Sequence, residues 1–399
     1  MFPIMPSLHR WLPASLVVAG LLLTAPAGAA VVRDRTCAVS GGGDTTIVAD
    51  PRARGFVSAA GTISTAMLFV DFSDAEGGAL DTKALYDLYV PRSERWFTEA
   101  SYGRAKLTVR PLHGWLRMPQ PGSAYFPPGG TGDFDRYITD ALRAADQTFD
   151  FRGVEIVYIV AAPRSGLDNG PAHFGPSRVL DGQKLSNFVT FGDDTVLSDP
   201  ASEINSKLLV HETGHEMSLP DYYSYDGGSD IHRNLGFWDP MGEAFLGNHF
   251  SAWSKRMLGW LRPADFLCVR SGSATFDLRA IDSQRGRRGV FIRLSPTRAY
   301  IVEARRKQGF DTPICTEGVV VYRLDGRKAG DKGSLTVRRH LPDSGDDSAC
   351  SGGLTVGRFD RAPFTPGSAF RDRAAGVTVQ VLSQTAAGYR VRVTKSRPR

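Results

Sequence analysis

The sequence predicts an α+β protein in which a mixed sheet with helices against it, over residues 61–262, is followed by a β-rich region over residues 263–399. In the first region, short apolar runs typical of buried strands alternate with stretches of helical spacing. In the second, short alternating runs follow one another without helical periodicity. With 399 residues, of which 42% are hydrophobic, the chain is long enough for two domains.

Residues 1–29 have the pattern of a signal peptide: Arg10, an apolar run over residues 14–23, and small residues with an expected cleavage site after Ala29. A membrane-spanning helix needs about 20 apolar residues. This run is shorter, so we expect a secreted protein without stable membrane association. Residues 30–60 are rich in glycine, aspartate and arginine, which predicts a weakly structured lead-in or a short pro-segment.

Local periodicity then places the elements of the first region. Strands are expected at residues 62–72, 107–109 and 154–161, and amphipathic helices at residues 83–99 and 134–145. This alternation favours a sheet with helices packed against it.

A third helix is expected to begin at Asp199-Pro200, because aspartate can cap the free amides and proline tolerates the first turn. It should run to about Met217, since Pro220 prevents its continuation. The second region is expected to form strands at residues 275–278, 289–294, 299–303, 318–324, 377–382 and 389–393.

Four cysteines in an exported chain predict two disulfide bonds. Three pairings are possible, and we favour Cys315 with Cys350, which closes a loop inside one region and leaves Cys37 for Cys268. A Cys37 thiolate that blocks a metal site is the alternative, and the even cysteine count disfavours it.

The segment HETGH at residues 211–215 carries the chemistry that the sequence suggests. Residues four apart lie on one helix face, so His211 and His215 can present two imidazoles to one zinc ion. Ile204 and Leu208 continue this face and would carry it inward. Glu212 would lie beside a water whose pKa the metal lowers, as a general base.

Several motifs around this segment resemble, in order, those of the immune inhibitor A family of secreted metallopeptidases, in the metzincin group. The stretch HETGHEMSLPDY resembles its extended zinc motif, FWDPMG its Met-turn, and SAWSKRMLGWL the helix that follows. The likeness covers about residues 61–325 and includes LFVDFSD at 68–74, ASYGRAKL at 100–107, YIVEAR at 300–305, GFD at 309–311 and GVVVY at 318–322.

The resemblance implies a metzincin-like catalytic domain in which His211, His215 and Asp221 bind zinc. It implies that Glu212 is the general base and acid and that Met241 forms a hydrophobic floor under the metal. This chain has Ser218 where the family has glycine, at a turn that often needs a positive φ.

On the residues alone, Asp226, Asp230 and His232 remain alternatives to Asp221 as the third ligand, because all follow the helix closely. A hydrogen-bond donor to the reacting carbonyl could come from several side chains near the motif. The candidates are His232, His249, Tyr222, Tyr223 and Tyr225.

Two further features are expected around the site. Residues 184–191 could form the edge strand along which an extended peptide binds. Aspartate-rich loops at residues 193–194, 226–230 and 343–347 could hold calcium, although they lack the EF-hand spacing and solvated loops share this composition.

The expected function is that of a secreted, monomeric, zinc-dependent endopeptidase acting on proteins or peptides. The alternative is a secreted binding protein on an inactive peptidase scaffold, although the intact Glu212 disfavours it. The formal charge of +6 is scattered among 42 acidic residues and comes with no nucleic-acid motif, so we expect no nucleic-acid partner.

Overall fold

The computed structural model describes residues 32–33, 36–47, 52–78, 80–228, 230–341 and 359–396. The signal peptide expected at residues 1–29 and the cysteine at Cys350 lie outside these residues. Within them, no helix has both the length and the apolar character needed to cross a membrane.

The first sheet has five strands in the order β3-β2-β4-β6-β5. Strands β2 (Gly61–Asp71), β3 (Ala105–Arg117), β4 (Ile156–Ala161) and β6 (Gln183–Phe191) are parallel to one another, and β5 (Ala172–Leu180) pairs antiparallel with β6. The mixed sheet expected from the alternation of strands and helices is therefore present.

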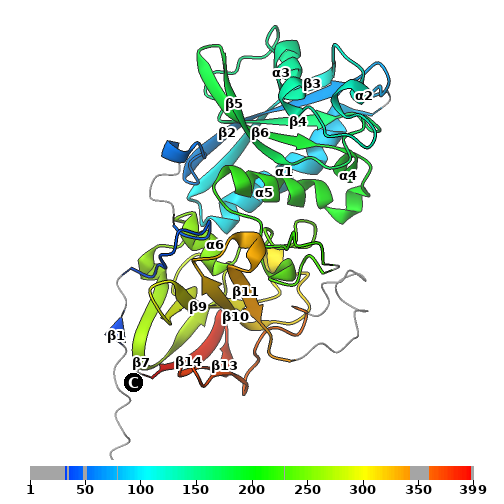
Figure 1. The fold of residues 1–399 in the computed structure, drawn as a ribbon. Coiled ribbons are helices and arrows are strands. Elements are labelled where there is room, and N and C mark those ends of the chain that lie inside the picture. The colour runs from blue at the N-terminus through cyan, green and yellow to red at the C-terminus, as the bar shows by residue number, and fades with distance from the viewer. Residues whose placement is uncertain are drawn as a thin grey trace, which may run out of the picture.

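Helices cover both faces of this sheet (Figure 1). α1 (Thr82–Ala100) and α5 (Ile204–Glu216) pack on one face, and α3 (Phe134–Ala145) packs on the other. Successive residues of β2 point to opposite faces, so Ile63, Met67 and Phe69 share a core with α1 and α5, whereas Ala66, Leu68 and Val70 share one with α3. The short helices are α2 (Gly122–Tyr125) and α4 (Asp193–Val196).

The expected strand at residues 184–191 exists as β6, but it is not at the edge of the sheet. β5 pairs with β6 and ends the strand order, so the prediction of an edge at residues 184–191 is wrong. β5 escaped detection because Gly175 and Pro176 interrupt its sequence pattern, and proline is tolerated on an edge strand.

The expected helix start at Asp199-Pro200 is also wrong. Asp199 accepts a hydrogen bond from the Ala201 amide and caps only a short 3₁₀ turn, η2 (Pro200–Ser202). Glu203 then has a φ of 59°, which interrupts the helical path, and α5 begins at Ile204. The Glu203 carboxylate lies 2.7 Å from the Arg92 guanidinium.

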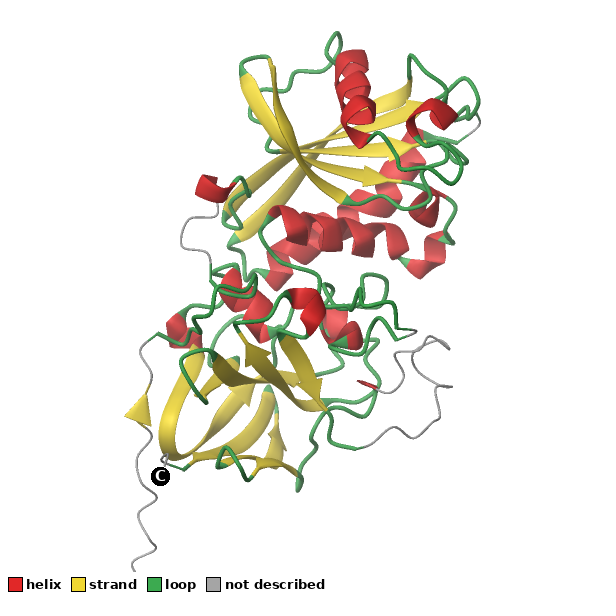
Figure 2. Ribbon diagram, viewed as in Figure 1, coloured by secondary structure: helices red, strands yellow, loops and turns green. Residues whose placement is uncertain are grey.

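The second sheet is a curled, mainly antiparallel sheet, as expected for a β-rich region (Figure 2). Its main strand order is β11-β10-β9-β8-β7-β14-β13-β12, and β1 also pairs with β7. The bounds are β1 (Val32–Arg33), β7 (Phe266–Arg279), β8 (Gly289–Arg293), β9 (Arg298–Arg305), β10 (Gly318–Asp325), β11 (Leu335–Arg338), β12 (Ala369–Asp372), β13 (Val377–Thr385) and β14 (Gly388–Lys395). The helix α6 (Ala252–Met257) lies between this sheet and α5 in Figure 1.

The lead-in before β2 is more ordered than its composition suggests. The buried Trp253 and Trp260 indoles donate to the carbonyls of Thr45 and Ala59, at 3.1 Å and 2.7 Å. Gly43 N–H donates to the Gly326 carbonyl of the second region. The described part of residues 30–60 is thus packed into the fold, contrary to the expectation of weak structure.

The disulfide pairing of Cys37 with Cys268 is confirmed, with a Cα–Cα distance of 5.5 Å. Cys315 is also disulfide-bonded, and its favoured partner, Cys350, lies outside the described residues. Because the Cys37 sulfur is in a disulfide, it has no thiolate with which to block a metal site.

Candidate metal centre

Helix α5 places the HETGH segment in the interior, under the first sheet. His211 is 1% exposed and Glu212 6% exposed. Gly214 permits a close approach from below, since a Cβ there would lie 2.7 Å from the Met241 sulfur. Met241 is fully buried at this contact, where the resemblance places the floor of the site.

Three side chains converge beside this helix. Asp221 Oδ1 lies 3.3 Å from His211 Nε2 and 3.2 Å from His215 Nε2. The three ligand atoms all lie within 4.8 Å of one another. The structure therefore brings together the two histidines and the aspartate that the motif resemblance names.

The imidazoles direct lone pairs at this point. His211 Nδ1 lies 2.8 Å from the Pro240 carbonyl, and His215 Nδ1 lies 2.8 Å from the Leu219 carbonyl. A carbonyl only accepts, so each Nδ1 carries the hydrogen, and the Nε2 of a neutral ring is an acceptor. Asp221 Oδ1 is buried without a hydrogen-bond partner. Three acceptors that face one another need a positive charge between them.

The acid–base properties of the site agree with this need. Burial disfavours protonated His215, but the Asp221 carboxylate outweighs burial and raises the pKa of His215 to about 9. Burial also disfavours the Asp221 carboxylate, yet the adjacent imidazoles of His211 and His215 lower its pKa well below the usual value. In the absence of a metal cation, protons would therefore bind at this site. Two imidazoles and one carboxylate fit zinc and leave one position of a tetrahedral ion open.

The turn between the helix and Asp221 has the geometry that the resemblance requires. Ser218 has a φ of 77°, so serine adopts the left-handed conformation usual for glycine. Leu219 N–H then donates to the Gly214 carbonyl at 3.0 Å, and Pro220 leads the chain out of the helix. The substitution of serine for glycine therefore leaves the path to Asp221 intact.

The segment of residues 238–241, which lies outside helix α5, contacts two of the candidate ligands or their neighbours. The Pro240 carbonyl fixes the ring of His211, as described above. The Met241 carbonyl accepts a 2.7 Å hydrogen bond from Tyr222 N–H, the amide next to Asp221. Partners of this kind set ligand orientation in metal sites.

Glu212 lies at the edge of the ligand group and is not part of it. Its Oε2 accepts a 2.8 Å hydrogen bond from Ala172 N–H, the first amide of β5, and its Oε1 lies 3.8 Å from His211 Nε2. Burial raises the pKa of Glu212, which brings it closer to the value that suits a general base at neutral pH.

Two tyrosines border the ligands. The half-buried Tyr223 has its hydroxyl 3.2 Å from His211 Nε2, with the two rings stacked. Tyr225 donates to Asp221 Oδ2 at 2.6 Å. Tyr222 points into the core instead, with its hydroxyl 3.3 Å from the Ser254 hydroxyl.

The other candidates do not belong to the ligand group. His232 Nδ1 lies 2.9 Å from the Gly242 carbonyl, and its Nε2 lies 3.4 Å from a Glu243 oxygen. His249 is 1% exposed, which keeps it from substrate. Asp226 forms an ion pair with Arg233.

The calcium expectation receives no support from the described loops. Among the residues with a described position, His211, His215 and Asp221 are the only group of three His, Cys, Asp or Glu side chains close enough to share a metal ion. Asp193 instead accepts a hydrogen bond from the Arg164 amide. Residues 343–347 lie outside the described residues.

Several groups that complete the site carry no local sequence signal. The Ala172 amide, the Pro240 carbonyl and the Leu219 carbonyl act through the backbone, so their side chains do not mark them. Tyr225 was one of five donor candidates, but its bond to Asp221 depends on the fold of the loop.

Neither the protein-family models nor the curated proteins compared with this chain give a match.

Proposed function

We propose that this chain is a secreted zinc-dependent endopeptidase, similar to the immune inhibitor A family. The observation that carries the proposal is the convergence of His211 Nε2, His215 Nε2 and Asp221 Oδ1 next to the carboxylate of Glu212. A purely structural zinc site is usually closed by four protein ligands. Here three side chains would bind the metal, which leaves one coordination position open beside the base.

His211, His215 and Asp221 would hold the metal, and Glu212 would handle the proton. When bound, zinc makes a water more acidic and polarises the carbonyl of the peptide bond. Glu212 would take a proton from the attacking water through Oε1, because Oε2 is held by the Ala172 amide, while the water oxygen bonds to the peptide carbonyl carbon. The same carboxyl would then deliver the proton to the amine nitrogen as the C–N bond breaks.

Tyr223 would stabilise the negative charge that develops on the carbonyl oxygen. Its hydroxyl faces the His211 Nε2 lone pair, which a bound cation would take. Burial raises the pKa of Tyr223 far above its usual value, so the hydroxyl stays protonated. A protonated donor beside the reacting carbonyl is the requirement for this role.

β5 is the surface along which an extended substrate would bind. It ends the first sheet, and its first amide contacts Glu212, so a peptide paired with this strand would pass the base. Phe174 and Val179 on β5 are 54% and 67% exposed, which offers apolar contacts to the substrate. An open edge strand suits cleavage within a chain and supports an endopeptidase.

The test uses the purified mature protein with casein and a zinc measurement. We expect about one zinc per chain and cleavage that a chelator abolishes and zinc restores. Glu212→Gln should keep zinc but lose cleavage, whereas Glu99→Gln, on the exposed end of α1, should keep both. Cleavage that survives the chelator or Glu212→Gln would refute the mechanism. Zinc binding without any cleavage would favour the inactive binding protein instead.

A further inference from the structure

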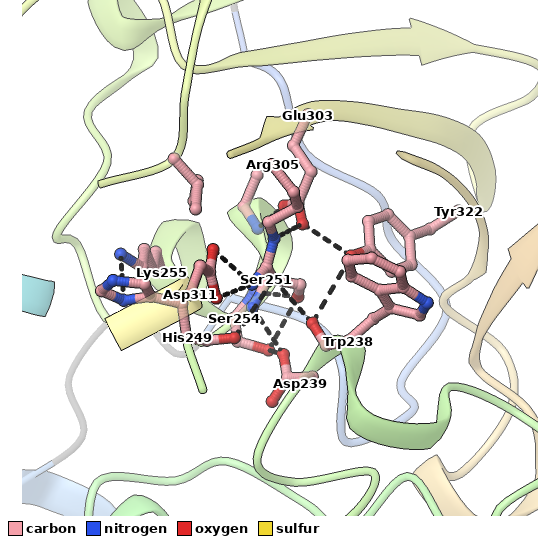
Figure 3. Close-up of polar contacts among 12 residues, drawn as sticks. Trp238, Asp239, His249, Ser251, Ser254, Lys255, Glu303, Arg305, Asp311 and Tyr322 are labelled. Carbon is pink, nitrogen blue, oxygen red and sulfur yellow. Dashed lines mark hydrogen bonds and ion pairs between the residues drawn. The ribbon is translucent and has the colours of Figure 1, made fainter. Parts of the chain in front are cut away.

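A buried ionic cluster lies beside Trp238 and Asp239, which shortly precede Met241 in the sequence (Figure 3). It contains Glu303, Arg305 and Asp311, which come from the YIVEAR and GFD motifs of the second region. Arg305 Nε donates to Glu303 at 2.6 Å, and Arg305 Nη1 lies 3.0 Å and 3.2 Å from the two Asp311 oxygens. The proposed reaction uses none of these residues.

The remaining guanidinium nitrogen of Arg305 reaches the segment that supports the metal ligands. Arg305 Nη2 donates to the Trp238 carbonyl at 2.6 Å and to the His249 carbonyl at 3.1 Å. Arg305 is fully buried. The fork of the guanidinium is thus satisfied by two carboxylates on one side and two backbone carbonyls on the other.

Neighbouring groups tie the same segment to α6. The Asp239 carboxylate accepts hydrogen bonds from Met241 N–H at 2.9 Å, Ser251 N–H at 2.8 Å and the Ser254 hydroxyl at 2.6 Å. Residues 238–241 are therefore fixed at two adjacent positions. The Pro240 carbonyl that orients His211 and the Met241 carbonyl that holds the amide beside Asp221 follow directly in sequence.

A role in stability alone does not account for this arrangement. Removing charges from water costs free energy that an ion pair often fails to recover, and well-packed apolar groups can replace such clusters without loss. Arg305 differs from an apolar residue in one respect that matters here: it fixes a backbone carbonyl at a defined point. Only two residues separate that carbonyl from Met241.

We propose that Arg305 is a positioning residue of the metal centre, which sets the rings and backbone of the ligands through the Trp238 carbonyl. The second region then contributes to the metal centre. Residues 61–262 alone would bind zinc with lower affinity than the full chain. This inference rests on the proposed zinc function. It extends that function to a residue of the second region, far from the metal ligands in the sequence.

The test compares Arg305→Lys with Tyr322→Phe and with a matched control, Arg306→Lys. Lysine keeps the charge of Arg305 but cannot bridge two carboxylates and two carbonyls. Tyr322→Phe removes a 2.6 Å hydrogen bond to Glu303 and a 3.5 Å contact with the Trp238 carbonyl. Arg306 is the next residue in sequence but pairs with Glu317, away from the cluster.

The readouts are the zinc dissociation constant of the folded metal-free protein, by competition with a chromophoric chelator, and kcat and KM on a quenched peptide. We expect Arg305→Lys to weaken zinc binding by roughly 10- to 100-fold and to lower kcat with little change in KM. Tyr322→Phe should weaken zinc binding about threefold. Arg306→Lys should match the wild type.

A structural role alone would lower the unfolding temperature of Arg305→Lys yet leave zinc affinity and kcat unchanged well below that temperature, and this result would overturn the inference. If Arg305→Lys does not fold, Tyr322→Phe decides, and wild-type zinc affinity in that variant would also overturn it. A wild-type protein that binds no zinc would refute the proposed function itself, which is a distinguishable failure.

Discussion

Two tyrosines of the same loop should fail in different ways when each loses its hydroxyl. Tyr225→Phe removes the hydrogen bond to Asp221 Oδ2, and Tyr223→Phe removes the hydroxyl beside His211 Nε2. In the proposed function, the first contact would orient a metal ligand, whereas the second hydroxyl would contact the substrate. The pair therefore separates metal binding from transition-state stabilisation, with each variant as the control for the other.

The structure sets the size of each effect. The 2.6 Å bond from Tyr225 ends on a charged acceptor, and such bonds contribute about 1.5–3 kcal/mol. Tyr225 is 62% exposed, so we take the low end. A loss of about 1.4 kcal/mol weakens zinc binding roughly tenfold. Loss of one donor to the developing oxyanion costs about 100-fold in kcat, which is the value expected for Tyr223→Phe.

The assay titrates zinc into each metal-free variant and then measures kcat at saturating zinc. Tyr225→Phe should recover nearly full kcat once zinc is saturating, because only ligand orientation is impaired. Tyr223→Phe should bind zinc within about threefold of the wild type and remain slow. Equal losses of kcat in both variants at saturating zinc would refute the division of roles.

Three further predictions follow from the site and its surroundings. Asp221→Ala should weaken zinc binding by more than about 100-fold, which exceeds the effect of losing a residue that only hydrogen-bonds to a ligand. Asp226→Ala should keep zinc and turnover. Equal zinc content in the two variants would refute the ligand assignment. Ser218→Gly should raise the free energy of unfolding by about 0.5 kcal/mol, because relief of left-handed strain exceeds the entropy that glycine adds to the unfolded chain. Ser218→Ala keeps the strain and should show no gain, so equal stabilities by denaturant titration would mean that the turn is unstrained. Burial, together with the charge of Arg305, lowers the pKa of Lys255 from 10.5 to about 7. Between those pH values the unfolded chain binds a proton that the folded chain lacks. The free energy of unfolding of the wild type should therefore rise relative to that of Lys255→Met as pH rises from 7 to 10, by up to about 1.4 kcal/mol per pH unit. Parallel curves of unfolding free energy against pH would contradict this.

Elements with a strong local pattern could be predicted from the sequence. The helices at residues 83–99 and 134–145 and the strand at residues 62–72 match α1, α3 and β2 within one residue at each end. Each helix buries a regular stripe, which periodicity indicates, whereas β2 is buried on both faces, which an unbroken apolar run indicates. The same reasoning missed β5, whose glycine and proline are acceptable only because the strand lies at the edge.

The candidate site divides in the same way between local and distant contacts. His211 and His215 follow from helical spacing, since both lie on one short helix. Asp221 could be singled out only by the motif resemblance, because its approach depends on the left-handed turn at Ser218. The Ala172 amide and Arg305 come from other parts of the chain, and no local pattern predicts contacts made by tertiary folding.

The same tertiary contacts bear on whether residues 30–60 could be removed as a pro-segment. Val57 N–H donates to the Glu216 carbonyl at the end of the helix that carries the ligands, at 2.9 Å. Loss of Ala59 and Thr45 would leave the buried Trp260 and Trp253 indoles without acceptors, and each unsatisfied donor costs about 1–3 kcal/mol. The disulfide from Cys37 to Cys268 would also hold a cleaved segment on the second region. The described residues between 36 and 60 thus support the helix that carries His211 and His215, and removing them would destabilise the protein.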